Sequence, residues 1–486
     1  MAVIVNGDEL YKKAQDLLVN PTSKDPYVDY EKAFHWFNVL LNGAYENNDK
    51  GLAALYFAVG STSLKRGHYM LAMLCCHKVI EIDPDFLEAH NNLGYVYKKF
   101  GKEEEAKYYF KHVVEAAEQR ESRSEEFIKE LANFYANYGS MFVGRGIPDE
   151  ALAIFNKGMS YNPDDEMLKY NRSLAYLEKG DYEKGFVDWD LGERVERVGN
   201  RNYGRDNLPW WDGTPGKKLV VIGEQGIGDE IMYATLLPKL MKDCGVVFDF
   251  HPRLVELFRR SFPDVDIYGT RKDQSDIWGT RYQFDAKVML GSLPRFYCKS
   301  EDDFLPSAYL KADPVLVEKY REKLEALGGR PKIGISWRGG SIHHNRRHIP
   351  MEKLVGILKM PADFISLQYD KNIDDMVATF EKEHGVSLNH WPDVLDDYDE
   401  TAGLVANLDL VISVPQSVVH LAGALGVMTI QMTPKAAMWQ MGPYGKNMPW
   451  YDCVSSVWQD DFDDWDSVVK KIEGQLCSLL QTSTAA

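Results

Sequence analysis

The spacing of hydrophobic residues divides the chain into two parts. Through residues 1–200, Ala, Tyr, Leu and Lys follow helical spacing with few prolines, which predicts a series of α-helices. From residue 217 onward, short β-branched runs bounded by glycine alternate with longer amphipathic stretches, a pattern typical of parallel strands connected by helices. We therefore expect an α-helical region followed by an α/β region.

A repeat period is visible in the helical part. Glycine, alanine and a third residue recur at fixed spacings in the triplets Gly60, Ala72, Cys76, then Gly94, Ala106, Phe110, then Gly139, Ala151, Phe155. These positions resemble the tetratricopeptide repeat, a helix-turn-helix unit of about 34 residues in which small residues let two helices pack closely. We expect units near 53–86, around 92–110, at 132–165 and, in degenerate form, at 166–199, and assign residues 1–200 to this domain.

Stacked repeats form a curved surface that often binds peptides or other proteins. Asparagines such as Asn92 and Asn137 either line that surface or are simply solvated, and the sequence leaves both readings open. We expect the repeats to recruit a protein, a peptide or glycan acceptor, or a second copy of the chain.

The α/β part contains two similar runs of strands and helices. The first begins with a strand near 218–222, which leads through a glycine-rich loop at 223–228 into a helix near 231–240. Its further strands lie near 246–250, 265–268 and 286–290. The second has strands near 332–336, 364–368, 408–414 and 427–432. Two α/β halves, assigned to 201–325 and 326–486, predict a ligand cleft between them.

Composition narrows the possible functions. A formal charge of −17 and a pI near 5.2 argue against a broad nucleic-acid footprint, because phosphate would be repelled. The six cysteines lack metal-ligand spacing. The N-terminus lacks the features of a signal peptide and no run of 18 apolar residues occurs, so we expect a cytoplasmic protein without membrane insertion.

Several motifs of the α/β part, taken together, resemble the heptosyltransferase-like glycosyltransferases of family 9. They are the Gly-Glu-Gln-Gly-Ile-Gly-Asp loop at 223–229, the Ile-Ser-Trp of 335–337, the Arg-His-Ile-Pro of 347–350, the Phe-Ile-Ser-Leu-Gln of 364–368 and the helical run 417–426. The resemblance implies a GT-B fold of two Rossmann-like domains. It also implies an inverting, metal-independent glycosyltransferase that uses a nucleotide-diphospho-sugar as co-substrate and needs no further cofactor.

The resemblance also suggests roles for individual residues. Asp229 matches the catalytic base, while Gln225, Gly226 and Gly228 form the acceptor loop around it. The alternative role for Asp229 is structural: its carboxylate would accept a backbone N–H as the N-cap of the helix that follows the loop. The residues expected to bind the donor are Trp337, Arg338, Arg347, Gln368, Gln416, Ser417, His420 and Lys435. Two of these residues have structural alternatives to donor binding: His420 as a packed histidine with satisfied hydrogen bonds, and Lys435 as a solvated loop lysine.

Two departures from the family pattern leave other functions open. Pro415 stands where the family often has an aspartate, and Gln440 where it has an arginine. These losses support an alternative in which the chain is a non-catalytic repeat scaffold with a degenerate glycosyltransferase-like domain. A dinucleotide-dependent oxidoreductase with Asp249 as ribose ligand is a third reading, which the GxxGxG spacing of the glycines disfavours.

Overall fold

The computed structural model describes residues 35, 49–120, 124–192, 208–224, 226–270, 281–304, 307–339, 347–369 and 373–483. They form two compact units. The first takes its described residues from Met1–Phe142 and Glu150–Asn171, and the second from Val143–Asp149 and Arg172–Ala486. Gln225 and the predicted boundary at residue 200 lie outside the described residues, and the domain boundaries stay predictions.

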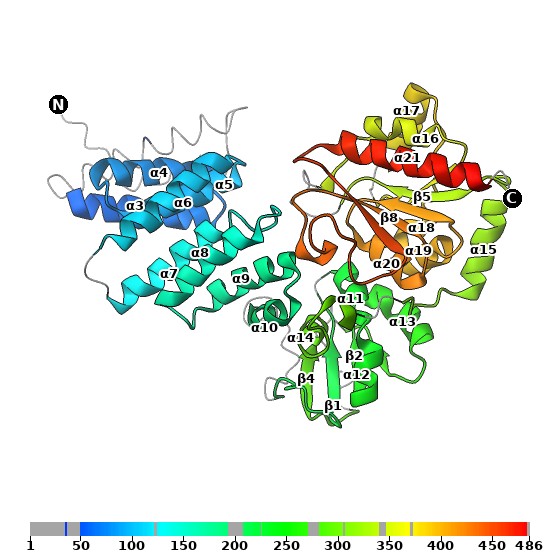
Figure 1. Ribbon diagram of the computed structural model, residues 1–486, viewed down its shortest axis with the longest axis horizontal. Helices are drawn as coiled ribbons and strands as arrows, with labels where there is room; N and C mark the ends of the chain where they lie inside the picture. Colours follow the sequence, from blue (N-terminus) through cyan, green and yellow to red (C-terminus); the bar gives the residue numbers. More distant parts are fainter. Residues whose placement is uncertain are drawn as a thin grey trace, which may run out of the picture. The chain divides into compact units, whose positions relative to one another are not determined.

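The helical part is built from successive helix pairs, seen in blue to green in Figure 1. The helices are α3 (Asp49–Lys65), α4 (Tyr69–Ile82), α5 (Leu87–Lys99), α6 (Glu103–Glu118), α7 (Glu125–Gly139), α8 (Pro148–Tyr161), α9 (Glu166–Lys179) and α10 (Tyr182–Gly192). Each pair contributes one predicted repeat, which confirms the expected α-helical region. The last helix, α10, groups with the second unit.

The glycines of the repeat pattern mark the places where paired helices touch. A Cβ atom at Gly94 would lie 2.7 Å from the ring of Phe110, and one at Gly139 would meet the ring of Phe155. At Gly60 the nearest atoms belong to Cys75 and Cys76, at 3.1 and 3.5 Å. At Gly94 and Gly139 the glycine thus makes room for the phenylalanine ring sixteen positions later, and at Gly60 for a pair of cysteines, which explains physically the period seen in the sequence.

The second unit contains two sheets of parallel strands, as predicted. The first runs β3-β2-β1-β4 and the second β6-β5-β7-β8-β9 among the described residues. The strands of the first sheet are β1 (Lys218–Ile222), β2 (Gly245–Asp249), β3 (Ile267–Tyr268) and β4 (Ala286–Met289). Those of the second are β5 (Lys332–Ser336), β6 (Asp363–Ser366), β7 (Leu410–Ser413), β8 (Thr429–Thr433) and β9 (Val454–Trp458).

Helices follow the strands in both halves. In the N-terminal half they are α11 (Ile227–Ala234), α12 (Leu237–Asp243), η2 (Pro252–Leu254), α13 (Val255–Ser261), η4 (Leu290–Ser292), α14 (Leu293–Tyr297), η5 (Glu301–Asp303) and α15 (Pro314–Glu325). In the C-terminal half they are η7 (Met351–Leu354), α16 (Val355–Leu358), α17 (Ile373–His384), α18 (Asp393–Asp396), α19 (Tyr398–Val405), α20 (Ser417–Leu425), η8 (Trp439–Met441) and α21 (Trp465–Ser483).

Each sheet is covered on its faces by these helices. Figure 1 shows α16 and α21 over one face of the C-terminal sheet and α19 and α20 over the other. A continuous apolar core joins β5, β7 and β8 to α21, through residues such as Ile335, Ile412 and Ile472. Across the described ranges, no helix is both long and apolar enough to cross a membrane.

The helix expected at 231–240 is wrong in its bounds. The structure begins α11 at Ile227, inside the glycine loop, and ends it at Ala234. A second helix, α12, then starts at Leu237, with Pro238 in its first turn. Proline cannot continue a helix because its ring blocks the preceding turn, but it suits a helix start. The earlier start places Asp229 in the first turn of α11.

A glycine substitution tests the packing of the repeat. We expect Gly94→Ala to destabilise the helical unit by about 1–3 kcal/mol, because its Cβ would overlap the buried Phe110 ring. Denaturant unfolding followed by circular dichroism measures this. Gly474→Ala in α21 is the control: nothing lies within 4 Å of its Cβ, so the protein should gain up to about 1 kcal/mol. Equal effects of the two substitutions would contradict the packing account.

Candidate functional site

The glycine loop that follows β1 is fixed by buried carboxylates. Glu224 accepts the backbone N–H of Gly291 at 2.6 Å, and Glu230 accepts that of His251 at 2.8 Å. Both side chains are almost fully buried. Because a buried carboxylate is costly unless it accepts such bonds, these contacts tie the loop to the turns after β4 and β2. The loop that carries Asp229 is therefore part of the rigid edge of the N-terminal sheet.

Gly226 leaves room for the proposed base. It is the N-cap residue of α11, and a Cβ at this position would lie 2.5 Å from the Asp229 carboxylate oxygen Oδ2. Any side chain there would displace the carboxylate. Asp229 itself is neither fully buried nor fully exposed. The glycine at position 226 is thus explained by the room that the Asp229 side chain needs.

Gly228 brings the two halves of the α/β unit into contact. A Cβ on Gly228 would lie 3.3 Å from the α-carbon of Ser417 and 3.2 Å from the ring of His420. Ser417 is the first residue of α20, and Gly228 lies in the first turn of α11. The N-terminal turns of the two helices therefore meet, with Asp229 next to the point of contact.

Arg347 adds a cation to this junction from the C-terminal half. Its guanidinium donates to the Pro415 carbonyl at 3.3 Å, just before α20. Burial lowers the pKa of Arg347, and the nearby charge of Asp229 opposes that shift. Because an arginine stays charged in proteins, Arg347 supplies a half-buried positive charge that the charge of Asp229 attracts. The structure thus brings together Gly226, Gly228, Asp229, Arg347, Ser417 and His420 from the predicted set.

The edge of the C-terminal sheet is closed by a network of serines and glutamines. Ser336, Ser366 and Ser413 end three adjacent strands, β5, β6 and β7. The Gln368 oxygen accepts from the Ser336 hydroxyl at 3.1 Å and from the Arg338 N–H at 2.8 Å. The Gln416 amide donates to Ser336 and, at 3.2 Å, to Ser413. Gln368 and Gln416 therefore hold the strand ends in register.

Other residues predicted to bind the donor lie in different surroundings. Trp337 is only 2% exposed and packs in the apolar core, which favours a structural role for its indole. Arg338 is exposed at the end of β5 and pairs by its backbone with His348. These placements do not test donor binding, so the roles of Trp337, Arg338 and Gln368 stay predictions.

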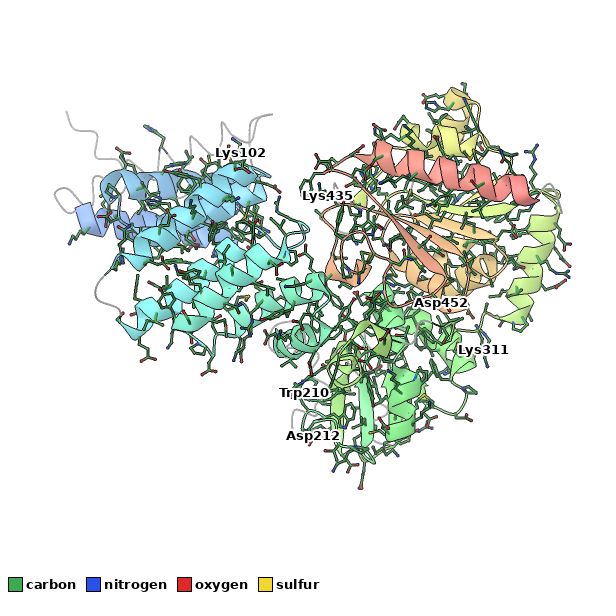
Figure 2. All side chains as sticks on the ribbon, in the orientation of Figure 1. Lys102, Trp210, Asp212, Lys311, Lys435 and Asp452 are labelled. Carbon is green, nitrogen blue, oxygen red and sulfur yellow. The ribbon has the colours of Figure 1, made fainter. Side chains whose placement is uncertain are left out.

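Lys435 interacts with the acidic segment before α21. Its ammonium group lies 3.1 Å from the Asp461 carboxylate, donates to the Asp460 carbonyl at 3.0 Å and lies 5.3 Å from the centre of the Phe462 ring. Figure 2 labels Lys435 at the edge of the C-terminal half, near the start of α21. Its place in the donor site also stays a prediction.

The sequence analysis gave no role to the buried acids Glu224 and Glu230. It gave none either to the serines at the strand ends, Ser336, Ser366 and Ser413. Glu224 and Glu230 were visible beside the glycines, and a glutamate within an otherwise apolar helix start is a signal of a buried hydrogen bond. The common serine at the ends of β5, β6 and β7 was a second usable signal. Asp249, considered as a ribose ligand, instead accepts the N–H and hydroxyl of Thr270 at 2.9 and 2.5 Å.

Comparisons with known proteins find similarities in sequence and in structure. Residues 75–108 match the tetratricopeptide repeat family. Protein FlbA of Caulobacter vibrioides is 26% identical over 491 residues, covering 88% of this chain and 76% of FlbA. The chain thus carries a tetratricopeptide repeat. Two of the solved structures to which the chain is similar are glycosyltransferases.

One is the family 9 glycosyl transferase of Veillonella parvula, with 10% identity, a TM-score of 0.44, and coverage of 55% of this chain and 98% of that one. The other is an O-GlcNAc transferase mutant from Thermobaculum terrenum, with 13% identity, a TM-score of 0.35, and coverage of 90% and 92%. Both TM-scores are low, so the function has to be inferred from the geometry of the chain itself.

The buried histidine at the junction gives a pH prediction. Burial lowers the pKa of His420 to about 4, below its ordinary value of 6.5. Between these two values the unfolded chain binds a proton that the folded chain does not, so the stability contribution of the neutral ring is full above pH 6.5 and is lost as the pH falls toward 4.

We expect His420→Gln to remove this loss. On going from pH 7 to pH 4, the unfolding free energy should fall by ~3 kcal/mol more in the wild type than in the variant, as measured by denaturant unfolding. The control is His384→Gln, a partly exposed histidine of α17, which should follow the wild type within about 0.5 kcal/mol. Parallel pH curves for the wild type and His420→Gln would contradict the assignment.

Proposed function

We propose that this chain is an inverting, metal-independent glycosyltransferase that moves a sugar from a nucleotide-diphospho-sugar to an acceptor hydroxyl. The observation that carries the proposal is the contact of Gly228 with Ser417 and His420. The contact supports the proposal because Asp229 of the N-terminal half is next to Gly228, and Arg347 of the C-terminal half donates to the Pro415 carbonyl just before the same helix start. The repeats serve to recruit the acceptor or a partner protein.

The electrostatics of this junction favour an anion. The N-terminus of a helix carries about half a positive elementary charge, and here the first turns of α11 and α20 meet. Asp229 and Glu230 offset the charge of the first turn of α11, whereas Arg347 adds a full positive charge beside the start of α20. Positive charge therefore gathers on the α20 side, where a diphosphate can satisfy the N–H groups of the helix start. The donor diphosphate is accordingly assigned to the start of α20 and Arg347.

Asp229 is then the general base. In an inverting displacement, a base on the face opposite the leaving group takes the proton of the attacking hydroxyl. The carboxylate of Asp229 comes from the opposite half of the unit, which suits that arrangement. As the bond to the sugar breaks, negative charge develops on the leaving nucleoside diphosphate, and Arg347 with the α20 helix start would stabilise it.

Across the described residues, no three histidine, cysteine, aspartate or glutamate side chains gather in a way that could hold a metal ion. Metal independence therefore stays part of the proposal and is open to direct test with a chelator. The proposed reaction uses only the charges of the chain itself.

Replacing the base tests the mechanism. We expect Asp229→Asn to lower kcat by about 10²–10⁴-fold, because a general base typically contributes that much. Nucleoside diphosphate affinity should stay equal or rise, since a negative charge beside the anion is removed. Release of nucleoside diphosphate from a panel of nucleotide sugars measures turnover, with the exposed Asp264→Asn as matched control. Unchanged turnover in Asp229→Asn would refute the assignment.

Cation replacement tests the donor site. We expect Arg347→Gln to weaken binding of UDP, GDP or ADP by about 10–100-fold, because a half-buried charged hydrogen bond is lost. Calorimetric titration measures the affinity. Lys382→Gln is the comparison: this exposed lysine of α17 is no part of the proposed donor site, so the loss should stay within about threefold. The donor assignment fails if the two substitutions weaken binding equally.

A non-catalytic scaffold is the second candidate, and one observation favours it. The polar groups of Gln368, Gln416 and Lys435 are engaged by partners within the chain. A site whose polar side chains serve only the fold would bind no nucleotide. Absence of binding for every nucleoside diphosphate in the titration of the unaltered chain would therefore favour the scaffold.

A further inference from the structure

The turn between α7 and α8 belongs to a different unit from the two helices that it joins. The chain leaves the first unit after Phe142, contributes Val143–Asp149 to the second unit, and returns to the first at Glu150. A turn inside an ordinary repeat would pack with its own helices. This turn packs within the second unit instead.

Glu178, near the end of α9, holds this turn in place. Its two carboxylate oxygens accept the backbone N–H groups of Gly144 and Gly146, each at 2.7 Å. Gly144 and Gly146 both have φ of 73°, a conformation that side chains disfavour. Successive N–H groups in such a turn form a concave site for an anion, and here the anion is a buried side chain that is 8% exposed.

The turn also lies against the loop between β8 and β9, residues 434–453. A Cβ at Gly144 would lie 3.4 Å from the Ala437 carbonyl, and one at Gly146 would lie 3.9 Å from Tyr444. Arg145 lies 5.9 Å from the ring of Phe462, which Lys435 approaches as well. The turn therefore fits between the end of α9 and this loop.

Neighbouring residues support the same loop. A Cβ at Gly180, directly after α9, would lie 3.2 Å from Pro443. In α10, the rings of Phe186 and Trp189 lie 5.6 and 5.3 Å from Trp439. Trp439 and Gln440 are adjacent, so the loop that carries the departure at Gln440 packs on the end of the repeat series.

We propose that the α7–α8 turn is a support for the 434–448 part of this loop and that Glu178 is the residue that positions it. The proposal rests on the proposed function only in assigning the loop to the half that binds the donor. Movement of α7 or α8, such as a bound partner would cause, then reaches the donor half through residues 143–149. A partner bound to the repeats would then change the nucleotide affinity of the donor half through this turn.

Hydrogen exchange of the full, ligand-free chain tests this support. Glu178→Gln keeps the shape of the side chain but places an amide donor against one of the two N–H groups. We expect exchange to rise about tenfold in 143–149 and also in 434–448, because a buried hydrogen bond is lost, while β8 stays as in the wild type. Glu166→Gln, an exposed glutamate on the same helix, should change neither segment.

Two results would overturn the proposal. Faster exchange in 143–149 with an unaltered 434–448 would show that the turn supports nothing beyond itself. An equal rise in β8 would show that Glu178 acts on the stability of the whole unit. Gly146→Ala is a second variant that keeps the carboxylate and strains only the turn, and it should raise exchange in the same two segments by a smaller factor.

Nucleotide affinity separates this proposal from the proposed function. If the unaltered chain binds a nucleoside diphosphate, Glu178→Gln should weaken that binding by about threefold to tenfold, since the loop must be ordered again on binding. If the unaltered chain binds none, the proposed function fails. The exchange result still stands, because it is measured without any ligand.

Discussion

The close approach of two helix N-termini is the constraint on which the α/β unit depends. Gly228 in the first turn of α11 lies against Ser417 at the start of α20, at distances that exclude any side chain larger than hydrogen without movement. Two positive helix ends at this distance repel each other, and the Asp229 carboxylate offsets part of that repulsion. The loop glycines therefore serve the electrostatics of the junction as much as the turn itself.

Local signals in the sequence were sufficient for the repeats and for most strands. The glycine of each repeat and the residue sixteen positions later, such as Gly94 and Phe110, touch because the helix-turn-helix unit has a fixed length. The strands β1, β5 and β7 were found because parallel strands buried on both faces are continuous apolar runs. In such elements, the sequence pattern and the packing follow from the same geometry.

Contacts between distant segments could not be predicted in this way. The strand β9 and the helix α21 went unassigned, since β9 has Ser455 and Ser456 in its middle and the residues after it are acidic. The bond from Glu178 to Gly144 spans 34 residues, and that from Gln416 to Ser336 spans 80. The ion pair of Lys435 with Asp461 likewise joins residues that lie 26 apart in the sequence.

The end of the repeat series is built into the α/β unit by an aromatic cluster. Phe304 of the N-terminal half lies 4.7 Å from Trp450 and 5.0 Å from Tyr182 of α10, between ring centres. Phe186 and Trp189 of α10 extend the cluster to Trp439. Each such ring buries a large apolar area, so separating α10 from the two halves would expose it to water. A repeat helix held in this way is a structural part of the α/β unit, and an α/β unit cut from the chain after α10 would lose part of its own core.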